Sequence, residues 1–302
     1  MADQGRQYFY KYVSRDTSKI ILTNRTVRWS SPRLFNDPFD TQMDLIFDFD
    51  FDDLAEPFGN ELIRIIESGS AIPEKTIADK PHLVFLEATR QMVNGKLSPE
   101  VRNKILEFVP EQTQRLRELL PKFQDEIREV FRNMSLLCVS EPHDNLLMWS
   151  HYADQHKGAV LEFKCIPDPD YDTPLCAAKP VEYQRKMPIL ATLEDFIASS
   201  LGQEGVDWGE KIYNKIAFTK SIDWAYEREW RCVTKLRNPD GPGYEDIPFF
   251  PQEITKIYLG CRMVDRDIYE ILGLLTGDFA HVVAYQARKN PESFGLDFQR
   301  IN

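Results

Sequence analysis

The stretch LLMWSHYADQHKGAVLEF, residues 146–163, holds the strongest indications of fold and function in this chain. Its last five residues form a short apolar run, which predicts a buried strand. Its first half sets Trp149, Ser150, His151 and Tyr152 side by side. Each of these side chains carries a polar group that needs a partner when buried, so core packing alone rarely requires this mixture. We therefore expect a functional site beside a buried strand.

Three other segments combine aromatic and polar residues in the same way. They are YFYKY at residues 8–12, NDPFD at 36–40 and WAYEREWR at 224–231. Long stretches of sequence separate them from one another and from residues 146–163. The shared composition predicts that all four segments come together in space and form one site.

Runs rich in aromatic and β-branched residues predict strands, and apolar residues at helical spacing predict helices. The expected strands are 8–13, 27–29, 136–140, 159–163, 229–234, 254–259 and 281–285. The expected helices are 17–24, 60–68, 75–133, 191–220 and 265–275. Breaks are expected at Gly95, Pro99, Pro110 and Pro121, and 191–220 is interrupted near Gly202 to Gly205. We predict one α+β domain over residues 1–302, with a helical insertion at 60–133 that acts as a lid or partner surface.

Residues 45–53 alternate phenylalanine with aspartate. A period of two predicts a strand with Phe47, Phe49 and Phe51 on one face and the aspartates on the other. An exposed acidic face suits an edge strand, because its charges block pairing with another sheet edge. The same carboxylates are also a potential site for a divalent cation.

Composition narrows the function classes. The 302 residues are 42% apolar, which suits a globular core, and the net charge of −11 argues against broad binding to nucleic acid or to an anionic membrane. The N-terminus lacks an apolar signal region, and no apolar run is long enough to span a membrane. Five cysteines at irregular spacing favour reduced thiols over a disulfide framework or a zinc site. We expect a soluble, cytoplasmic protein without a metal site.

Glu227, Glu229 and Arg231 are predicted to share one face of a strand, opposite Trp230 and Cys232. A carboxylate in that position can act as a general base or stabilise a developing cation. A surface salt bridge between Glu229 and Arg231 accounts for the same spacing. The spacing leaves both interpretations open.

Other common catalytic motifs are absent. Ser150 and His151 are adjacent, so their side chains diverge, and the chain contains neither a Gly-x-Ser-x-Gly elbow nor a glycine-rich phosphate loop. A bound nucleotide would then be held by stacking aromatic rings and by cations that meet its phosphates. The candidates are Tyr10, Tyr12, Trp29, Trp149, Tyr152, Lys11, Arg28 and Lys220. Each of these aromatic residues also suits a core position.

The four segments together resemble those of a bacterial domain-of-unknown-function family, number 2971. Its members show Tyr-Lys/His-Tyr, Asn-Asp-Pro-Phe, Leu-Met-Trp-x-His-Tyr-Ala and Trp-x-Tyr-Glu-x-Glu-Trp-Arg in this order. The chain carries these motifs at residues 10–12, 36–39, 147–153 and 224–231. The resemblance extends over about residues 8–290.

The layout of that family is similar to the ADP-ribosyltransferase fold, which implies a split, mainly antiparallel sheet. In that fold an Arg or His on the first strand grips NAD, and a Glu on a later strand hydrogen-bonds the nicotinamide ribose. Lys11 takes the first place here and Glu229 the second. Lysine departs from the pattern, because it binds phosphate as a point charge and lacks the planar fork of arginine. Residues 219–226 would present the acceptor.

The resemblance implies a set of site residues and a function. The catalytic residues would be Glu229, Glu227 and His151. NAD, as a substrate, would contact Tyr10, Lys11, Tyr12, Ser30, Asn36, Asp37, Trp149, Tyr152, Lys220 and Arg231.

The function implied is that of an NAD-using ADP-ribosyltransferase or NAD glycohydrolase, acting as an intracellular toxin or phage-defence effector. Its partners would be a small-molecule nucleotide and a protein or nucleic-acid acceptor, without a membrane. The alternative is a non-catalytic nucleotide- or ligand-sensing module with a degenerate site. A nuclease is a third option, and it requires residues 44–53 to bind a metal ion.

Overall fold

The computed structural model describes residues 7–68, 83–93, 95–167, 173–203 and 207–302. The chain forms two compact units. The first comprises Met1–Gln42, Phe131–Arg185 and Ala217–Asn302, and the second comprises Met43–Val130 and Lys186–Ile216. The predicted insertion at 60–133 falls almost entirely in the second unit, which also takes in a later segment. The part of the prediction at 75–82 lies outside the described residues.

The first unit is built on a mixed but largely antiparallel sheet, in agreement with the expected fold class. Within the described residues this sheet has ten strands, and its main path runs β11-β2-β4-β1-β5-β12-β13-β14. β10 and β6 branch from β4. The strands are β1 (Tyr8–Val13), β2 (Thr26–Ser30), β4 (Met134–Ser140), β5 (Ala159–Lys164), β6 (Lys179–Pro180), β10 (Glu229–Lys235), β11 (Tyr244–Pro248), β12 (Ile254–Leu259), β13 (Val283–Lys289) and β14 (Leu296–Arg300).

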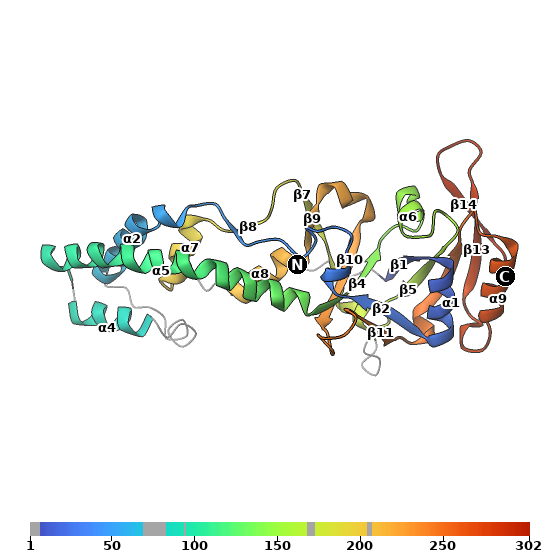
Figure 1. Cartoon of the computed structure of the whole chain (residues 1–302), viewed down its shortest axis with the longest axis horizontal. Coiled ribbons are helices and arrows are strands. Elements are labelled where there is room, and N and C mark those ends of the chain that lie inside the picture. The colour runs from blue at the N-terminus through green and yellow to red at the C-terminus, as the bar shows by residue number, and fades with distance from the viewer. Residues whose placement is uncertain (1–6, 69–82, 94, 168–172, 204–206) are drawn as a thin grey trace. The chain divides into compact units, whose positions relative to one another are not determined.

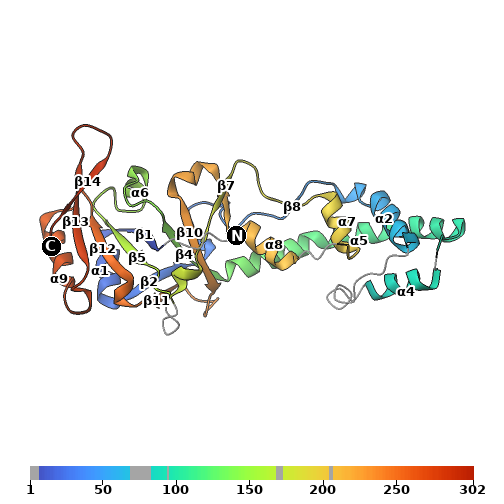
Figure 2. The same cartoon turned by 180° about the vertical axis from the view of Figure 1, so that it is seen from behind.

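Two hydrophobic layers cover this sheet, because successive side chains along each strand point to opposite faces. Leu161 of β5 joins the core beneath α1 (Arg15–Asn24) and α9 (Asp265–Leu274), while its neighbour Val160 faces the other way. Val160 packs with Trp149 of α6 (Leu146–His151). Figures 1 and 2 show α1 and α9 together near one end of the sheet and α6 apart from them. The first unit also contains a two-stranded parallel pair, β7 (Glu182–Gln184) and β9 (Thr219–Ser221), followed by the 3-10 segment η4 (Ile222–Glu227).

The second unit is mainly helical. Its helices pack through buried leucines and isoleucines such as Leu54, Ile63 and Leu86. A short parallel pair joins β3 (Ile46–Phe47) to β8 (Ile189–Ala191). The helices are α2 (Ala55–Ser68), α4 (Leu83–Val93), α5 (Pro99–Arg132), α7 (Leu193–Ser200) and α8 (Trp208–Ala217), of which α5 and α8 end inside the first unit.

The predicted acidic edge strand at 45–53 is wrong for most of its length. Only Ile46–Phe47 pairs as a strand, and Phe51–Asp53 forms a 3-10 turn. The alternation is overridden by tertiary packing, because the three phenylalanine rings gather around Phe196 instead of lying along a sheet. The carboxylates form ion pairs with α5, where Arg128 binds Asp44 and Arg117 binds Asp52.

Two further predictions need correction. Helix α5 continues through Pro110 and Pro121, where breaks were expected. Each proline removes one backbone donor, and the long remaining hydrogen-bond ladder keeps the helix intact. The expectation of five reduced thiols is also wrong, because Cys165 and Cys176 form a disulfide. The Cα atoms of the two cysteines lie 5.2 Å apart, a proximity that cysteine spacing does not show.

Candidate functional site

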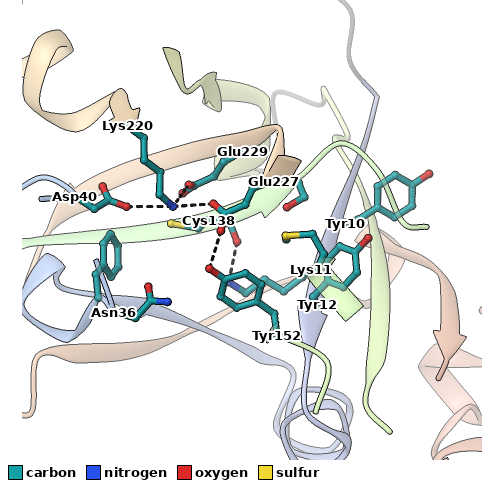
Figure 3. Close-up of a pocket in the computed structure, with 13 residues that line it drawn as sticks. Tyr10, Lys11, Tyr12, Asn36, Asp40, Cys138, Tyr152, Lys220, Glu227 and Glu229 are labelled. Atoms are coloured by element: carbon teal, nitrogen blue, oxygen red, sulfur yellow. Dashed lines mark hydrogen bonds and ion pairs between the residues drawn. The ribbon is translucent and has the colours of Figure 1, made fainter. Parts of the chain in front are cut away.

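The first unit encloses a cavity of about 150 Å³ that collects residues from four distant segments. We call it the carboxylate cavity (Figure 3). Its lining residues are Tyr10, Lys11, Tyr12, Phe35, Asn36, Asp40, Cys138, Ser140, Met148, Tyr152, Lys220, Glu227 and Glu229. All four segments that the sequence singled out therefore contribute residues to this cavity.

The cavity lies where strand β4 changes partner. β4 pairs with β2 at Leu136 and with β1 at Ser140, so the backbone of Cys138 lies between the two pairings. The ammonium of Lys11 donates a 2.7 Å hydrogen bond to the Cys138 carbonyl. Burial lowers the pKa of Lys11, although the negative charge of Glu229 opposes this shift. Among the described residues Lys11 has no carboxylate within ion-pair distance, so its charge is available to a ligand.

The NDPFD turn brings one acid into this cavity. Asp37 is buried, and its Oδ1 accepts a hydrogen bond from the backbone N–H of Phe39 at 2.9 Å. Its carbonyl also accepts from the backbone N–H of Asp40. Asp37 thus shapes the turn, while Asn36 and Asp40 line the cavity.

Lys220 lies at the centre of three carboxylates. Its Nζ is 2.7 Å from Glu227 Oε2, 3.0 Å from Glu229 Oε2 and 3.3 Å from Asp40 Oδ2. Figure 3 shows these four side chains pointing toward one another. Arg228, with a left-handed φ of 44°, separates the 3-10 segment that ends at Glu227 from strand β10, which begins at Glu229. Both glutamates consequently reach the same ammonium.

Arg231 is completely buried and holds the same acids from behind. Its Nε donates to Glu229 Oε1 at 2.7 Å, and its Nη2 donates to Asp40 Oδ2 at 2.7 Å. Its Nη1 donates to the carbonyl of Ala217 at 2.8 Å. The ion pair between Glu229 and Arg231 that the spacing suggested is therefore present, but it is buried. The loss of one partner of a buried pair destabilises the fold much more than the loss of a surface pair.

The two glutamates differ in their protonation chemistry. Burial raises the pKa of Glu227, and this effect outweighs the opposing charge of Lys220. Burial also acts to raise the pKa of Glu229, but Arg231 and Lys220 outweigh it and hold that pKa well below its ordinary value. Glu229 is thus ionised near neutral pH, whereas Glu227 can exchange a proton.

Helix α6 supplies one wall of the cavity. Asn145 caps the helix by accepting hydrogen bonds from the N–H groups of Leu147 and Met148. Met148 and Tyr152 line the cavity, and the Tyr152 hydroxyl donates to Glu227 Oε1 at 2.6 Å. Burial, followed by the hydrogen bond to Glu227, raises the pKa of Tyr152, so the phenol keeps its proton.

Eight of the thirteen predicted site residues line the carboxylate cavity, and five do not. The eight are Tyr10, Lys11, Tyr12, Asn36, Tyr152, Lys220, Glu227 and Glu229. Trp149 is fully buried in the core, with its Nε1 donating to the carbonyl of His143, and Ser30 pairs with Leu136 in the sheet. The other three are Asp37, Arg231 and His151, of which His151 is exposed beside the ring of Tyr226.

Five lining residues were missed by the sequence reasoning. Asp40 belongs to a segment that had been singled out, and its position two residues after Pro38 was the available signal. Cys138 and Ser140 alternate along the predicted strand 136–140, which placed them on one face. Met148 lies within the segment 146–163, where its place beside Trp149 was the available signal. Phe35 directly precedes the NDPFD segment, and no signal for it was available.

Comparison with known proteins supports only part of the resemblance. Residues 148–232 match the model of a family described as "Protein of unknown function (DUF2971)". The matched segment contains α6 from Met148 onward, β9 and the Glu-x-Glu pair. No curated protein and no solved structure gives a significant match.

Two further findings concern the described residues only. None of their helices combines the length and the apolar composition that a membrane span requires. Their His, Cys, Asp and Glu side chains form no group of three or more suited to a metal ion. The acids around Lys220 form ion pairs with Lys220 and Arg231.

Proposed function

We propose that this protein is an NAD-using ADP-ribosyltransferase or NAD glycohydrolase, with the carboxylate cavity as its active site. The observation that carries the proposal is that Glu227, Glu229 and Lys11 line one cavity. A toxin or phage-defence role belongs to the proposal through the family resemblance alone. At about 150 Å³ the cavity is smaller than the ~300–1,000 Å³ of pockets that hold whole ligands. It would therefore enclose only the nicotinamide end of NAD.

The reaction breaks the bond between ribose C1′ and the nicotinamide nitrogen, and both bonding electrons leave with neutral nicotinamide. The ribose becomes an oxocarbenium ion, which a nearby fixed negative charge stabilises. Glu229 suits this part, because Arg231 and Lys220 keep it ionised. Water or an acceptor nucleophile then attacks C1′ and gives its proton to Glu227, whose raised pKa makes it the better base.

Lys220 and Arg231, which were expected to contact NAD, have a different role in this proposal. Lys220 and Arg231 are occupied by carboxylates, so they would orient the acids instead of binding phosphate. Lys11 remains as the cation for a ligand's negative charge. The rings of Tyr12, Phe35 and Tyr152 would enclose nicotinamide.

A non-catalytic ligand-sensing module is the second candidate, and one observation favours it. Both oxygens of Glu229 already accept hydrogen bonds from protein cations. A carboxylate engaged in this way has less capacity to bind a ribose hydroxyl. As a sensing module, the protein would bind a ligand in the carboxylate cavity and leave its bonds intact.

Incubation of the purified protein with NAD, followed by quantification of free nicotinamide, tests the proposal. We expect release by the wild type, strong loss in Glu227→Gln and Glu229→Gln, and unchanged release in Glu182→Gln, an exposed acid on β7. Calorimetric NAD binding without release would support the sensing module. Absence of both binding and release would rule out NAD as the ligand.

A further inference from the structure

A second, larger cavity lies in the first unit, between α6 and the β13–β14 hairpin. Its volume is about 1010 Å³, at the upper end of the range for small-molecule pockets. We call it the hairpin cavity. Both views show the turn between β13 and β14 projecting beyond the sheet near α6 (Figures 1 and 2). The chemically informative lining residues are Ser150, His156, Arg262, Lys289, Glu292 and Phe294.

Helix α6 separates the hairpin cavity from the carboxylate cavity. Leu146 and Ser150 face the hairpin cavity, whereas Met148 and Tyr152 face the carboxylate cavity. A displacement of two residues turns a side chain by about 200° around a helix, so the two pairs lie on opposite faces. The cavities are therefore distinct sites that share one wall.

The hairpin cavity concentrates positive charge in a chain whose net charge is −11. Arg262 and Lys289 are exposed, and in the described part of the chain neither forms an ion pair with a carboxylate. Among the described residues, the guanidinium of Arg262 donates one long 3.4 Å hydrogen bond, to the carbonyl of Gln155. Glu292 is the one acid among the lining residues of this cavity.

His156 extends this group and is firmly positioned. Its ring stacks on that of Trp149, with 6.1 Å between the ring centroids and an interplanar angle of 11°. Its Nε2 is 3.3 Å from Ser150 Oγ. Burial lowers the pKa of His156, and the charges of Arg262 and Lys289 lower it further. His156, Arg262 and Lys289 thus line one cavity from three separate segments of the chain.

We propose that the hairpin cavity binds the phosphate group of a small phosphorylated molecule. Arg262 and Lys289 would neutralise the phosphate, Ser150 and His156 would supply hydrogen bonds, and the exposed ring of Phe294 would cover the organic part. A small molecule fits better than a nucleic acid, because the cavity is of ligand size and the protein's net charge repels a polyanion. This site does not depend on the function proposed for the carboxylate cavity.

Inorganic phosphate is the probe for a direct test. The full chain, labelled with ¹³C in its histidine rings, is titrated with sodium phosphate against sodium chloride of equal ionic strength. We expect a saturable shift of the His156 signals with phosphate alone. Arg262→Gln and Lys289→Gln should each weaken binding by about tenfold or more, as for loss of a charged hydrogen bond.

Matched controls separate the site from general charge effects. Arg288→Gln changes an exposed cation next to Lys289 on the same strand, but Arg288 does not line the cavity, so binding should persist. Lys11→Gln should also leave binding unchanged. A missing saturable shift, an equal loss in Arg288→Gln, or a loss in Lys11→Gln would each overturn the proposal. The last result would place the phosphate in the carboxylate cavity.

Discussion

Glu227 and Glu229 accept hydrogen bonds from one ammonium, that of Lys220, at 2.7 and 3.0 Å, yet their pKa values shift in opposite directions. The difference arises from Arg231, which donates twice to Glu229 and makes no hydrogen bond to Glu227 that the described residues show. Tyr152 instead donates to Glu227. Two acids in one cavity therefore differ in how readily they take up a proton, Glu227 more readily than Glu229.

Glu229→Gln should affect both turnover and stability. Nicotinamide release should slow by roughly two powers of ten or more, about 3 kcal/mol, as for other electrostatic groups in active sites. Because the change also removes half of a buried ion pair with Arg231, unfolding should become easier by about 3–5 kcal/mol. Urea denaturation measures the second effect. A stability equal to that of the wild type would show that the pair contributes nothing to folding.

The stability that Glu229 provides should depend on pH in a defined direction. Its pKa is lower in the folded state than the ordinary 4.5, so the unfolded chain binds more protons in acid. The contribution is therefore complete above about pH 4.5 and is lost as the pH falls through the folded-state pKa. Urea denaturation of wild type and Glu229→Gln at about pH 6 and about pH 3 should show a smaller stability difference at the lower pH. A constant difference contradicts the assignment.

Glu227→Gln should remove an acidic limb from the pH–rate profile. The pKa of Glu227 is raised, so the wild type should lose activity as the pH falls through that pKa and the base becomes protonated. Nicotinamide release should be about 10²–10⁴-fold slower in the variant and nearly independent of pH in this range. A variant that keeps the wild-type limb would show that another group is the base.

Lys11→Gln should weaken ligand binding more than it affects folding. In the described part of the chain the Lys11 ammonium donates one hydrogen bond, to a backbone carbonyl, and glutamine can also donate there. If Lys11 meets a negative group of NAD, the dissociation constant from calorimetry should rise about tenfold or more. Lys179→Gln on β6, a strand that pairs with β10, is the control, since Lys179 is exposed and outside the cavity. Equal affinity in both variants would place the ligand's charge elsewhere.

Trp230→Ala should destabilise the fold without touching the cavity. Trp230 is 8% exposed, and its ring lies 5.5 Å from that of Phe9 in the main core. Truncation of a buried aromatic residue should cost about 3–5 kcal/mol of unfolding free energy. Phe294→Ala, which changes a fully exposed ring, should cost less than about 0.5 kcal/mol. Thermal and urea denaturation compare the two variants directly.

Much of the fold could be predicted because its signals are local. Alternating apolar residues identified β1, β4, β5, β10 and β12, since side-chain direction in a strand follows from the backbone. The strands β11 and β14 were missed, because they are partly exposed and their sequences carry weak alternation. The segment 45–53 alternates clearly, yet packing against Phe196 prevented an extended strand.

Which segments contribute to the carboxylate cavity could be predicted from sequence, because clustered Trp, Tyr, His, Glu and Arg form a recognisable local pattern. The position and contacts of each side chain depend on the three-dimensional fold. The pairing of β4 with both β2 and β1 brings Lys11 to Cys138, and the left-handed residue Arg228 directs both glutamates toward Lys220. Contacts between distant segments likewise place Trp149 in the core and Asp40 in the cavity. Burial and charge pairing depend on distances between segments that are remote in the chain, and no local pattern encodes those distances.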